Sequence, residues 1–183
     1  ANPILQLDSL KELVSDCTNN EVDSLIIFDG NPVYAAPTDL NFAKALKQVK
    51  NIIHFGLYED ETAKIANWHI PAAHYLENFS DSRASNGTAS MIQPLIAPLF
   101  NGKSVHEFAE ALNGSEKRDY DCVSDYWKTQ SKALDFSKFF RTAIHDGFVS
   151  NSNYAYENAK ISTINISALK PTVQQGISIV FSP

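Results

Sequence analysis

Two histidines and a glutamate lie close together in a segment without regular periodicity. His69 and His74 are five positions apart and Glu77 follows three residues later, and these residue types are common zinc ligands. Ligands on a helix need a spacing of three or four residues, and Pro71 interrupts any helix through both histidines. We therefore expect no metal site here and interpret these side chains as hydrogen-bonding anchors of an ordered loop.

Two other histidines have an acidic neighbour in the sequence, which could suggest a catalytic dyad. His106 precedes Glu107, and His145 precedes Asp146. Consecutive residues of a helix point in different directions, so neither pair is expected to form a dyad by itself. A Ser-His-Asp triad assembled from distant positions stays open, but no G-x-S-x-G motif supports it. A hydrolase that uses His69 or His145 is therefore only the third functional alternative.

A tight turn directly after an apolar run is the most site-like motif of the chain. Asp29 is followed by Gly30-Asn31-Pro32. Glycine permits backbone conformations that other residues adopt only at a cost, and proline stiffens the turn. The exposed amides of such a turn, together with Asp29, could bind a nucleotide. The alternative is a purely structural connection, because any parallel sheet needs turns of this kind.

The remaining charged motifs have structural interpretations. Acidic residues from Glu59 to Glu61, followed by Thr62, suit the first turn of a helix and indicate a helix start rather than a metal site. Arg83, two residues after Asp81, could bind an anion or bridge carboxylates of its loop. A structural salt bridge is the more common role for such an arginine.

Hydrophobic patterning predicts the elements that position these motifs. Residues 24–28 and 51–57 are short apolar runs typical of buried parallel strands. Helices are predicted from Asp8 or Ser9 to about residue 18, over 39–49 and over 59–66. This alternation predicts a parallel α/β sheet with right-handed crossovers, in which ligands bind beyond the carboxyl ends of the strands. Residues 29–32 and 58–62 would lie on that rim.

The second half of the chain is less regular. Residues 67–100 contain many apolar side chains without helical or strand periodicity, which predicts an ordered segment wrapped over the rim. Ser104 and Glu107 form a capping box for a helix to residue 112. Further helices are predicted over 119–134 and 136–146, with Gly147 after the last one. Two late strands are predicted at 161–166 and 176–181.

Composition excludes several classes of function. The 183 residues are 44% hydrophobic and 20% charged with a net charge of -6, which predicts a globular protein and argues against nucleic acid or an anionic membrane as partner. No apolar run reaches the roughly 20 residues of a membrane helix, and no signal peptide is recognisable, so direct membrane insertion is not expected. Cys17 and Cys122 are expected to be free buried thiols, with a disulfide as the less common alternative.

Two long runs resemble a known family. IIFDGNPVYAAP and GLYEDETAKIANWHIPAAHYLE are similar to the central portion of molybdopterin oxidoreductases, in which a strand and a Gly-Asn-Pro loop precede an acidic-Thr helix start and an Ala-Asp-x-x-Leu-Pro-Ala...Glu segment. Ala66-Asn67 replaces Ala-Asp of that pattern, which removes one charge, and Glu77 occupies the glutamate position. The resemblance is strongest to one branch of the family, the large iron–sulfur subunit of alternative complex III. The segments that carry it are WHIPAAHYLE, Asp81-Ser82-Arg83-Ala84, Asn86-Gly87-Thr88, QPLIAPL and the later FFRTAIHDG.

The resemblance implies a fold and a set of roles. It implies a three-layer, doubly wound, mostly parallel α/β sheet of the molybdopterin oxidoreductase central-domain type with a helical C-terminal extension. Residues 1–183 would form a single α/β domain, with a core of about 20–115 and an extension over 116–183, as a fragment of a larger oxidoreductase subunit. The expected nucleotide rim consists of Asp29, Gly30, Asn31, Pro32, Glu61 and Thr62, and the expected structural strap contains His69, His74, Glu77 and Arg83.

The same resemblance implies two functional alternatives. In the alternative complex III branch the domain would be a scaffold without a cofactor, inside a bacterial membrane complex that passes electrons from menaquinol to a cytochrome c or an oxidase. The other subunits and domains of that complex would be its partners, iron–sulfur clusters would lie elsewhere in the parent, and the location would be the periplasmic side of the inner membrane. In ordinary members the domain contributes to binding molybdopterin guanine dinucleotide. The chain contains no cysteine motif for iron–sulfur clusters, so it is expected to be inactive alone.

Overall fold

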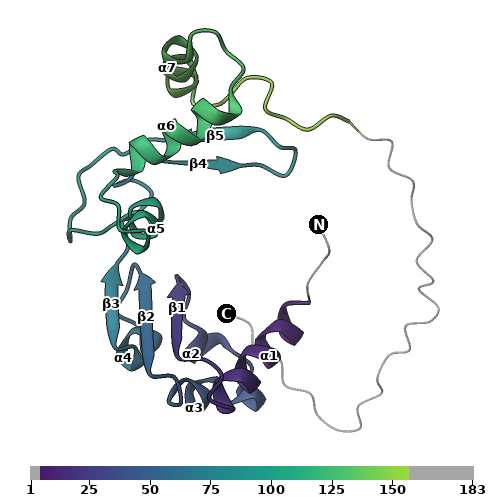
Figure 1. The fold of residues 1–183 in the computed structure, drawn as a ribbon, viewed down its shortest axis with the longest axis vertical. Helices are drawn as coiled ribbons and strands as arrows, with labels where there is room; N and C mark the ends of the chain where they lie inside the picture. The colour runs from purple at the N-terminus through teal and green to yellow at the C-terminus, as the bar shows by residue number, and fades with distance from the viewer. Residues whose placement is uncertain (1–4, 157–183) are drawn as a thin grey trace, which may run out of the picture.

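The computed structural model describes residues 5–156, which fold as a mixed α/β structure. The elements follow one another as α1 (Gln6–Thr18), β1 (Ser24–Phe28), α2 (Pro32–Ala35), the 3-10 helix η1 (Thr38–Leu40), α3 (Phe42–Leu46), β2 (Asn51–Gly56), α4 (Glu61–Ile65), β3 (Trp68–Pro71), β4 (Ser80–Arg83), β5 (Ala89–Ile92), α5 (Val105–Leu112), α6 (Asp119–Gln130) and α7 (Phe136–Asp146). Figure 1 shows the first half around one sheet, the second half around another, and α5 between them.

The first half contains the predicted parallel sheet. Its strand order is β1-β2-β3, and both neighbouring pairs are parallel. Leu25 lies beside Ile52, and His54 lies beside His69. The expectation of an α/β fold with a parallel sheet is confirmed, because the short apolar runs and the helices between them produce β-α-β units.

One face of this sheet is covered by helices. Phe42, Ala45 and Leu46 of α3 are buried together with Cys17 of α1 and Ile52 of β2. Leucine and valine side chains of α1 pack on this cluster, as do side chains of α2 and α4, and α2 and α4 lie behind the strands in Figure 1. Residues 5–156 therefore show one helical layer over the sheet, and the second layer of a three-layer arrangement stays a prediction.

The second half is built on an antiparallel hairpin. β4 and β5 pair with Ser82 opposite Ser90, and α6 and α7 cover the hairpin. The buried core of this half consists of Phe79, Ala89, Met91, Val123, Trp127, Phe140, Ala143 and Val149. Trp127 also donates its indole N–H to Asp81 Oδ2 at 2.9 Å, which satisfies the polar atom of a side chain that is otherwise buried.

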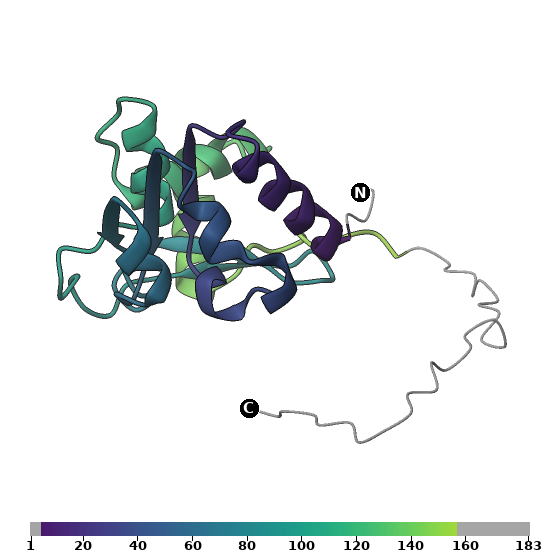
Figure 2. The same ribbon diagram turned by 90° about the horizontal axis from the view of Figure 1, so that it is seen from below.

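Helix α5 connects the two halves. Its capping box is formed as predicted, because Ser104 Oγ accepts from the Glu107 N–H at 3.1 Å and Glu107 Oε2 accepts from the Ser104 N–H at 3.2 Å. Phe108 of α5 packs edge-on against Phe28 and at a tilt against Phe55, with ring centroids 5.3 and 4.9 Å apart. Figure 2, which views the molecule from below, shows this helix on the side of the sheet opposite α4.

Two predictions of local structure are wrong. Residues 67–100 were expected to lack strands but contain β3, β4 and β5. The hairpin of β4 and β5 has no recognisable hydrophobic periodicity, because every residue of β4 is polar. The turn that connects the two strands contains Gly87 with φ +90°. The single helix expected over 39–49 is two short pieces, since Asn41 adopts a left-handed φ of 51° between η1 and α3.

Other boundaries differ by less. α1 begins at Gln6 without a side-chain cap, although Asp8 or Ser9 was the expected cap. α6 ends at Gln130 rather than at residue 134, whereas α7 spans the predicted residues and ends at Gly147 with φ 78°. The short helix α2 was not expected. The strands predicted at 161–166 and 176–181 lie outside the described residues.

Both cysteines are free in the structure. Cys17 is buried and Cys122 is half-buried, and burial raises the pKa of each thiol. Among residues 5–156 no group of three or more His, Cys, Asp or Glu side chains is arranged to hold a metal ion. No helix in that range has the length and apolar character needed to cross a membrane.

Candidate functional site: the rim of the parallel sheet

The turn after β1 has the backbone that its sequence suggested. Asp29 and Gly30 both adopt left-handed conformations, with φ of 54° and 71°. The Asp29 N–H donates to the Phe55 carbonyl at 2.7 Å, which fixes the turn to the neighbouring strand. A Cβ on Gly30 would meet no atom within 4 Å. The glycine is therefore required by the backbone conformation and not by crowding.

Asn31 lies at the centre of a hydrogen-bond network on the rim. Its Nδ2 donates to Glu61 Oε2 at 2.5 Å, and its Oδ1 accepts from Thr62 Oγ1 at 2.7 Å. The same oxygen caps α2 by accepting from the Tyr34 N–H at 3.3 Å, and Thr62 Oγ1 accepts from the Val33 N–H at 3.1 Å. The structure thus brings together three of the predicted rim residues, Asn31, Glu61 and Thr62, and joins the turn after β1 to the start of α4.

The electrostatics of the rim follow from this network. The hydrogen bond from Asn31 lowers the pKa of Glu61, and the backbone N–H of Glu61 lowers it further. Asp60 caps α4 by accepting from the Ala63 N–H at 2.9 Å, as expected for an acidic residue at a helix start. The rim therefore presents the ionised carboxylate of Glu61, which already accepts a hydrogen bond from the side-chain amide of Asn31.

A buried histidine behind the rim was missed by the sequence interpretation. His54 is only 1% exposed, and its Nε2 lies 3.2 Å from the Gly30 carbonyl while its Nδ1 lies 3.1 Å from His69 Nδ1. Because a carbonyl only accepts, His54 Nε2 must carry a proton. The parallel register places His54 beside His69, so recognition of residues 68–71 as the third strand would have revealed the pair. His69 is thus a strand residue that supports the rim.

His74 and Glu77 hold the loop after β3. Glu77 accepts from the His74 N–H at 2.9 Å and from the Leu99 N–H at 3.1 Å, and His74 Nδ1 accepts from the Leu76 N–H at 3.3 Å. The two ends of the loop are therefore joined through one carboxylate. These backbone donors lower the pKa of Glu77.

Arg83 holds the hairpin rather than a carboxylate. Its Nη1 donates to the carbonyls of Gly87 at 2.7 Å and Ser152 at 3.2 Å, and its guanidinium lies 5.8 Å from the centre of the Trp127 ring. Within residues 5–156 the expected salt bridge of Arg83 does not form, and its Nη1 donates to these two backbone carbonyls instead. Arg83 lies on the second sheet and not on the rim.

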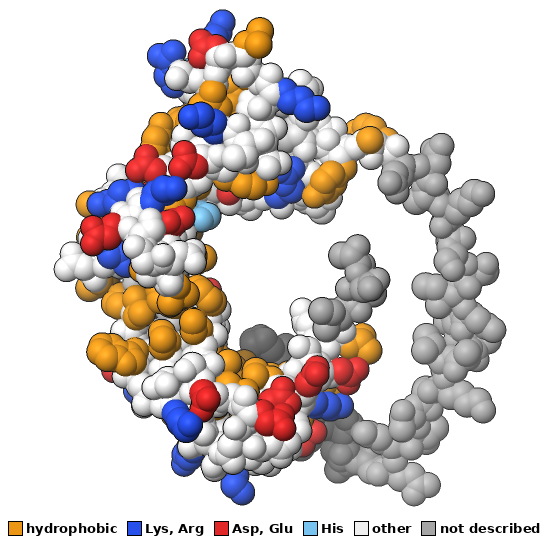
Figure 3. Space-filling model, viewed as in Figure 1, with side chains coloured by type: hydrophobic (Ala, Val, Ile, Leu, Met, Phe, Trp, Pro, Cys, Tyr) orange, Lys and Arg blue, Asp and Glu red, His pale blue; other side chains and the backbone are white. Residues whose placement is uncertain are grey.

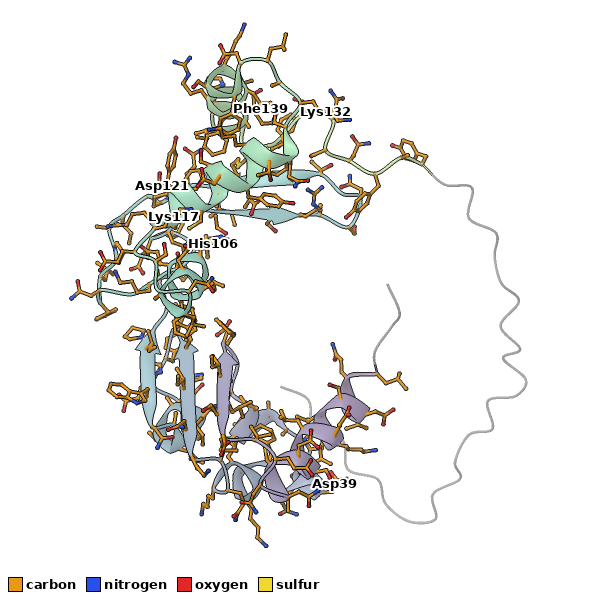
Figure 4. All side chains as sticks on the ribbon, viewed as in Figure 1. Asp39, His106, Lys117, Asp121, Lys132 and Phe139 are labelled. Carbon is orange, nitrogen blue, oxygen red and sulfur yellow. The ribbon has the colours of Figure 1, made fainter. Side chains whose placement is uncertain are left out.

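The other histidines do not build a catalytic centre in the part of the chain that the structure describes. His106 on α5 (Figure 4) lies 3.0 Å from Ser80 Oγ through its Nε2, and within residues 5–156 its second ring nitrogen has no carboxylate partner. His145 does contact Asp146, at 2.9 Å, contrary to the expectation that adjacent residues point apart, because Asp146 is the last residue of α7. The His145 side chain is 88% exposed, so the pair has no enclosed substrate site.

Replacing Thr62 by valine tests the rim network. Thr62 is fully buried, and valine keeps its shape while leaving the Val33 N–H without its acceptor and Asn31 Oδ1 without one donor. We expect a loss of about 1–3 kcal/mol in the free energy of unfolding, measured by urea denaturation. Thr62→Ser, which keeps the hydroxyl, is the matched control and should retain most of the stability. Equal losses in both variants would mean that packing, not the network, determines the effect.

Glu77 makes a pH-dependent contribution to stability. Its pKa in the folded state is lower than its ordinary value, so the stabilisation is present above the ordinary value and is lost as the pH falls through the folded-state pKa. Glu77→Gln can accept at one oxygen only, and we expect a lower urea midpoint at pH 7 with a difference that shrinks below about pH 4. Glu59→Gln, at an exposed carboxylate, is the control. A pH-independent difference would contradict this assignment.

Sequence comparison identifies relatives of the chain. It is 31% identical over 123 residues to the menaquinone reductase, molybdopterin-binding-like subunit of Nitratidesulfovibrio vulgaris (strain ATCC 29579), a match that covers 63% of this chain. This similarity agrees with the expected resemblance to the molybdopterin oxidoreductase family. A second relative is the assimilatory nitrate reductase catalytic subunit of Bacillus subtilis (strain 168), 23% identical over 129 residues and 70% of this chain. No model of a protein family matches.

The structure comparison agrees at the level of the fold. Acetylene hydratase from Pelobacter acetylenicus superposes with a TM-score of 0.51 and 17% identity over 56% of this chain. The matched parts are 18% of the menaquinone reductase subunit, 16% of the nitrate reductase subunit and 15% of the acetylene hydratase chain. The chain thus spans less than a fifth of the length of these molybdopterin oxidoreductase relatives and the structural neighbour.

Proposed function

We propose that the chain is a non-catalytic, scaffolding part of a larger electron-transfer subunit of the molybdopterin oxidoreductase family. The observation that carries this proposal is the closed network on the rim. The Asn31 side chain donates to Glu61 and accepts from the Thr62 hydroxyl and the Tyr34 N–H. The side chain that would be expected to face a nucleotide is therefore engaged within the protein. Such a rim stabilises the fold without a ligand.

The residues of the rim are a poor fit for the diphosphate of molybdopterin guanine dinucleotide. A diphosphate is bound by positive charges and by free backbone N–H groups. Here Asn31 donates to Glu61, whose lowered pKa keeps it negatively charged at neutral pH. An anion placed at this edge would be repelled by that carboxylate and would have to displace it from Asn31. We therefore derive no chemical step through this cofactor.

The proposed setting is a membrane respiratory complex of the alternative complex III type. Support comes from the resemblance of residues 68–77 and 93–99 to that branch, and from the similarity to a subunit named for menaquinone reductase. In this setting electrons pass from menaquinol to a cytochrome c or an oxidase, iron–sulfur clusters lie in other parts of the parent, and other domains and subunits are the partners. The complex would face the periplasm from the inner membrane, with no membrane insertion by this chain itself.

Titration calorimetry with guanosine diphosphate tests the proposal on the chain itself. We expect no binding heat at millimolar nucleotide, because the Asn31 side-chain amide is engaged by the negatively charged Glu61. Asn31→Ala should bind equally little. Binding by the original chain that is lost in Asn31→Ala would contradict the scaffold role and would assign the rim to the nucleotide.

The second candidate is a cofactor-binding part of an active molybdenum enzyme. It is favoured by the open space around Gly30, where a Cβ would touch nothing within 4 Å, and by the similarity to a catalytic subunit of nitrate reductase. In that case the Asn31–Glu61 hydrogen bond would have to open on binding. The flanking sequence of the parent gene discriminates the two, since an upstream cysteine, serine or selenocysteine ligand belongs to the enzyme and downstream cysteine quartets belong to the electron-transfer subunit.

A further inference from the structure

The hairpin of the second half has an outer edge at β4. In an antiparallel pair, residues that exchange hydrogen bonds with the partner strand alternate with residues whose backbone groups point away from it. On β5, Ala89 and Met91 bond to residues 147–149, which run alongside β5 on the side away from β4. The residues opposite them on β4 are Arg83 and Asp81. The backbone groups of these two residues therefore point to the outer edge of the hairpin.

No strand of the described part pairs with this outer edge. Among residues 5–156 no group accepts from the backbone N–H of Asp81 or of Arg83. In Figure 1, β5 lies on the α7 side of the hairpin and β4 borders the central opening of the view. Figure 3 shows both hydrophobic and charged side chains along this border. An unpaired edge strand is a template for pairing with another extended segment.

Helix α6 forms a groove beside this edge. Its inward face packs on the hairpin, and one of its flanks lines a pocket shared with α7. The opposite flank, with Cys122 and Tyr126, lines a second pocket together with residues 81–83 of β4 and His106 of α5. We name this second pocket the edge groove. Tyr126 is 47% exposed and Cys122 is half-buried, so the groove has room for side chains of an added strand.

The chain leaves the described part beside the same edge. Residues 147–149 run antiparallel to β5 and therefore towards the turn of the hairpin. At this turn the Tyr154 N–H donates to the Asn86 carbonyl at 2.8 Å, and a Cβ on Gly87 would lie 2.7 Å from the Tyr154 ring. The chain is thus held closely around the turn. A segment that follows Tyr156 and turns back would run along the outer edge of β4, antiparallel to it.

The next apolar run of the sequence has the pattern of a strand with two different faces. Residues 161–166, which lie outside the described part, read Ile-Ser-Thr-Ile-Asn-Ile. Side chains alternate between the two faces of a strand, so Ile164 and Ile166 would share one face. Thr163 and Asn165 would share the other. An extended segment with this sequence therefore has an apolar side to bury and a polar side for solvent.

The hairpin has a matching pair of faces. The Asp81 side chain points to α6, because it accepts from Trp127, whereas Ser82 lies on the other face and is exposed. We propose that residues 161–166 add to the outer edge of β4 as an antiparallel strand, with their apolar face in the edge groove and their polar face beside Ser82. The short connection over 157–160 raises the effective concentration of this segment above that of a second copy.

Amide hydrogen exchange in the 183-residue chain, followed by NMR, tests this proposal. We expect the Asp81 and Arg83 amides to exchange at least about a hundredfold more slowly than exposed amides. Ile164→Asp places a carboxylate in the edge groove and should return both amides to near the exposed rate. Thr163→Asp, on the polar face, is the matched control and should keep both amides protected. The Ser82 amide, which points to β5, reports that the hairpin stays folded in each variant.

Each other outcome overturns the proposal. Rapid exchange of the Asp81 and Arg83 amides in the unchanged chain would mean that the edge stays open. Protection that survives Ile164→Asp but is lost in Ile179→Asp would assign the edge to the later run over 176–181. Protection that appears only at high concentration, together with a dimer in sedimentation velocity, would assign it to a second copy. Protection that is equally lost in Ile164→Asp and Thr163→Asp would contradict the assignment of the two faces.

Discussion

Phe108→Ala is expected to lower the free energy of unfolding by about 3–5 kcal/mol, as for other buried phenylalanines. Phe108 is 6% exposed and its ring contacts Phe28 and Phe55, so its removal leaves a cavity between α5 and the parallel sheet. Because α5 connects the two halves of the structure, we also expect loss of protection at β1 and β2 amides in hydrogen exchange.

Phe108→Leu is the matched control for this prediction. Leucine fills most of the volume and keeps an apolar contact with Phe55, so its cost should be clearly smaller than that of alanine. Urea denaturation of the three proteins measures the series. A cost below about 1 kcal/mol for Phe108→Ala would contradict the role of this side chain in joining α5 to the sheet.

Trp127→Ala is expected to cost about 3–5 kcal/mol in the second half of the structure. Trp127 is 4% exposed, lies in the cluster between the hairpin and α6–α7, and donates to Asp81. Its loss removes packing around Phe140 and leaves a carboxylate without its donor. The measurement is the free energy of unfolding together with near-ultraviolet circular dichroism.

Trp127→Phe separates the two contributions of this residue. Phenylalanine keeps much of the ring but cannot donate to Asp81, so the hydrogen bond alone should account for about 1.5–3 kcal/mol. Pairing Trp127→Phe with Asp81→Ala, which removes the acceptor, forms a double-mutant cycle. A coupling energy near zero would show that the 2.9 Å contact contributes nothing to stability.

The parts of the fold that the sequence predicts are those with a local physical cause. The strand at 24–28 is a continuous apolar run between turn residues, and the capping box of Ser104 and Glu107 specifies the start of α5. The left-handed backbone at Gly147 ends α7 where predicted. In each case neighbouring residues determine the conformation, so one short window of sequence is enough.

The parts that the sequence does not predict depend on contacts between distant residues. β4 reads Ser-Asp-Ser-Arg and has no apolar alternation, so its pairing is determined by the packing of its partner β5 on α6 and α7. His54 lies in an apolar run and becomes significant only through the register that places it beside His69. The sequence predicted part of the rim, because it placed Asn31, Glu61 and Thr62 on the same edge of the sheet. The hydrogen bonds among these three side chains could be identified only from the structure.

The central claim is that the rim of this sheet supports the fold and does not hold a molybdenum cofactor. The most direct test is elemental analysis of the full-length protein, purified from its native host, for molybdenum and tungsten by plasma mass spectrometry, with protein quantified by amino-acid analysis. The account predicts metal far below one atom per polypeptide and no pterin fluorescence after acid oxidation. One atom of either metal per polypeptide, released together with a guanine nucleotide, would contradict it.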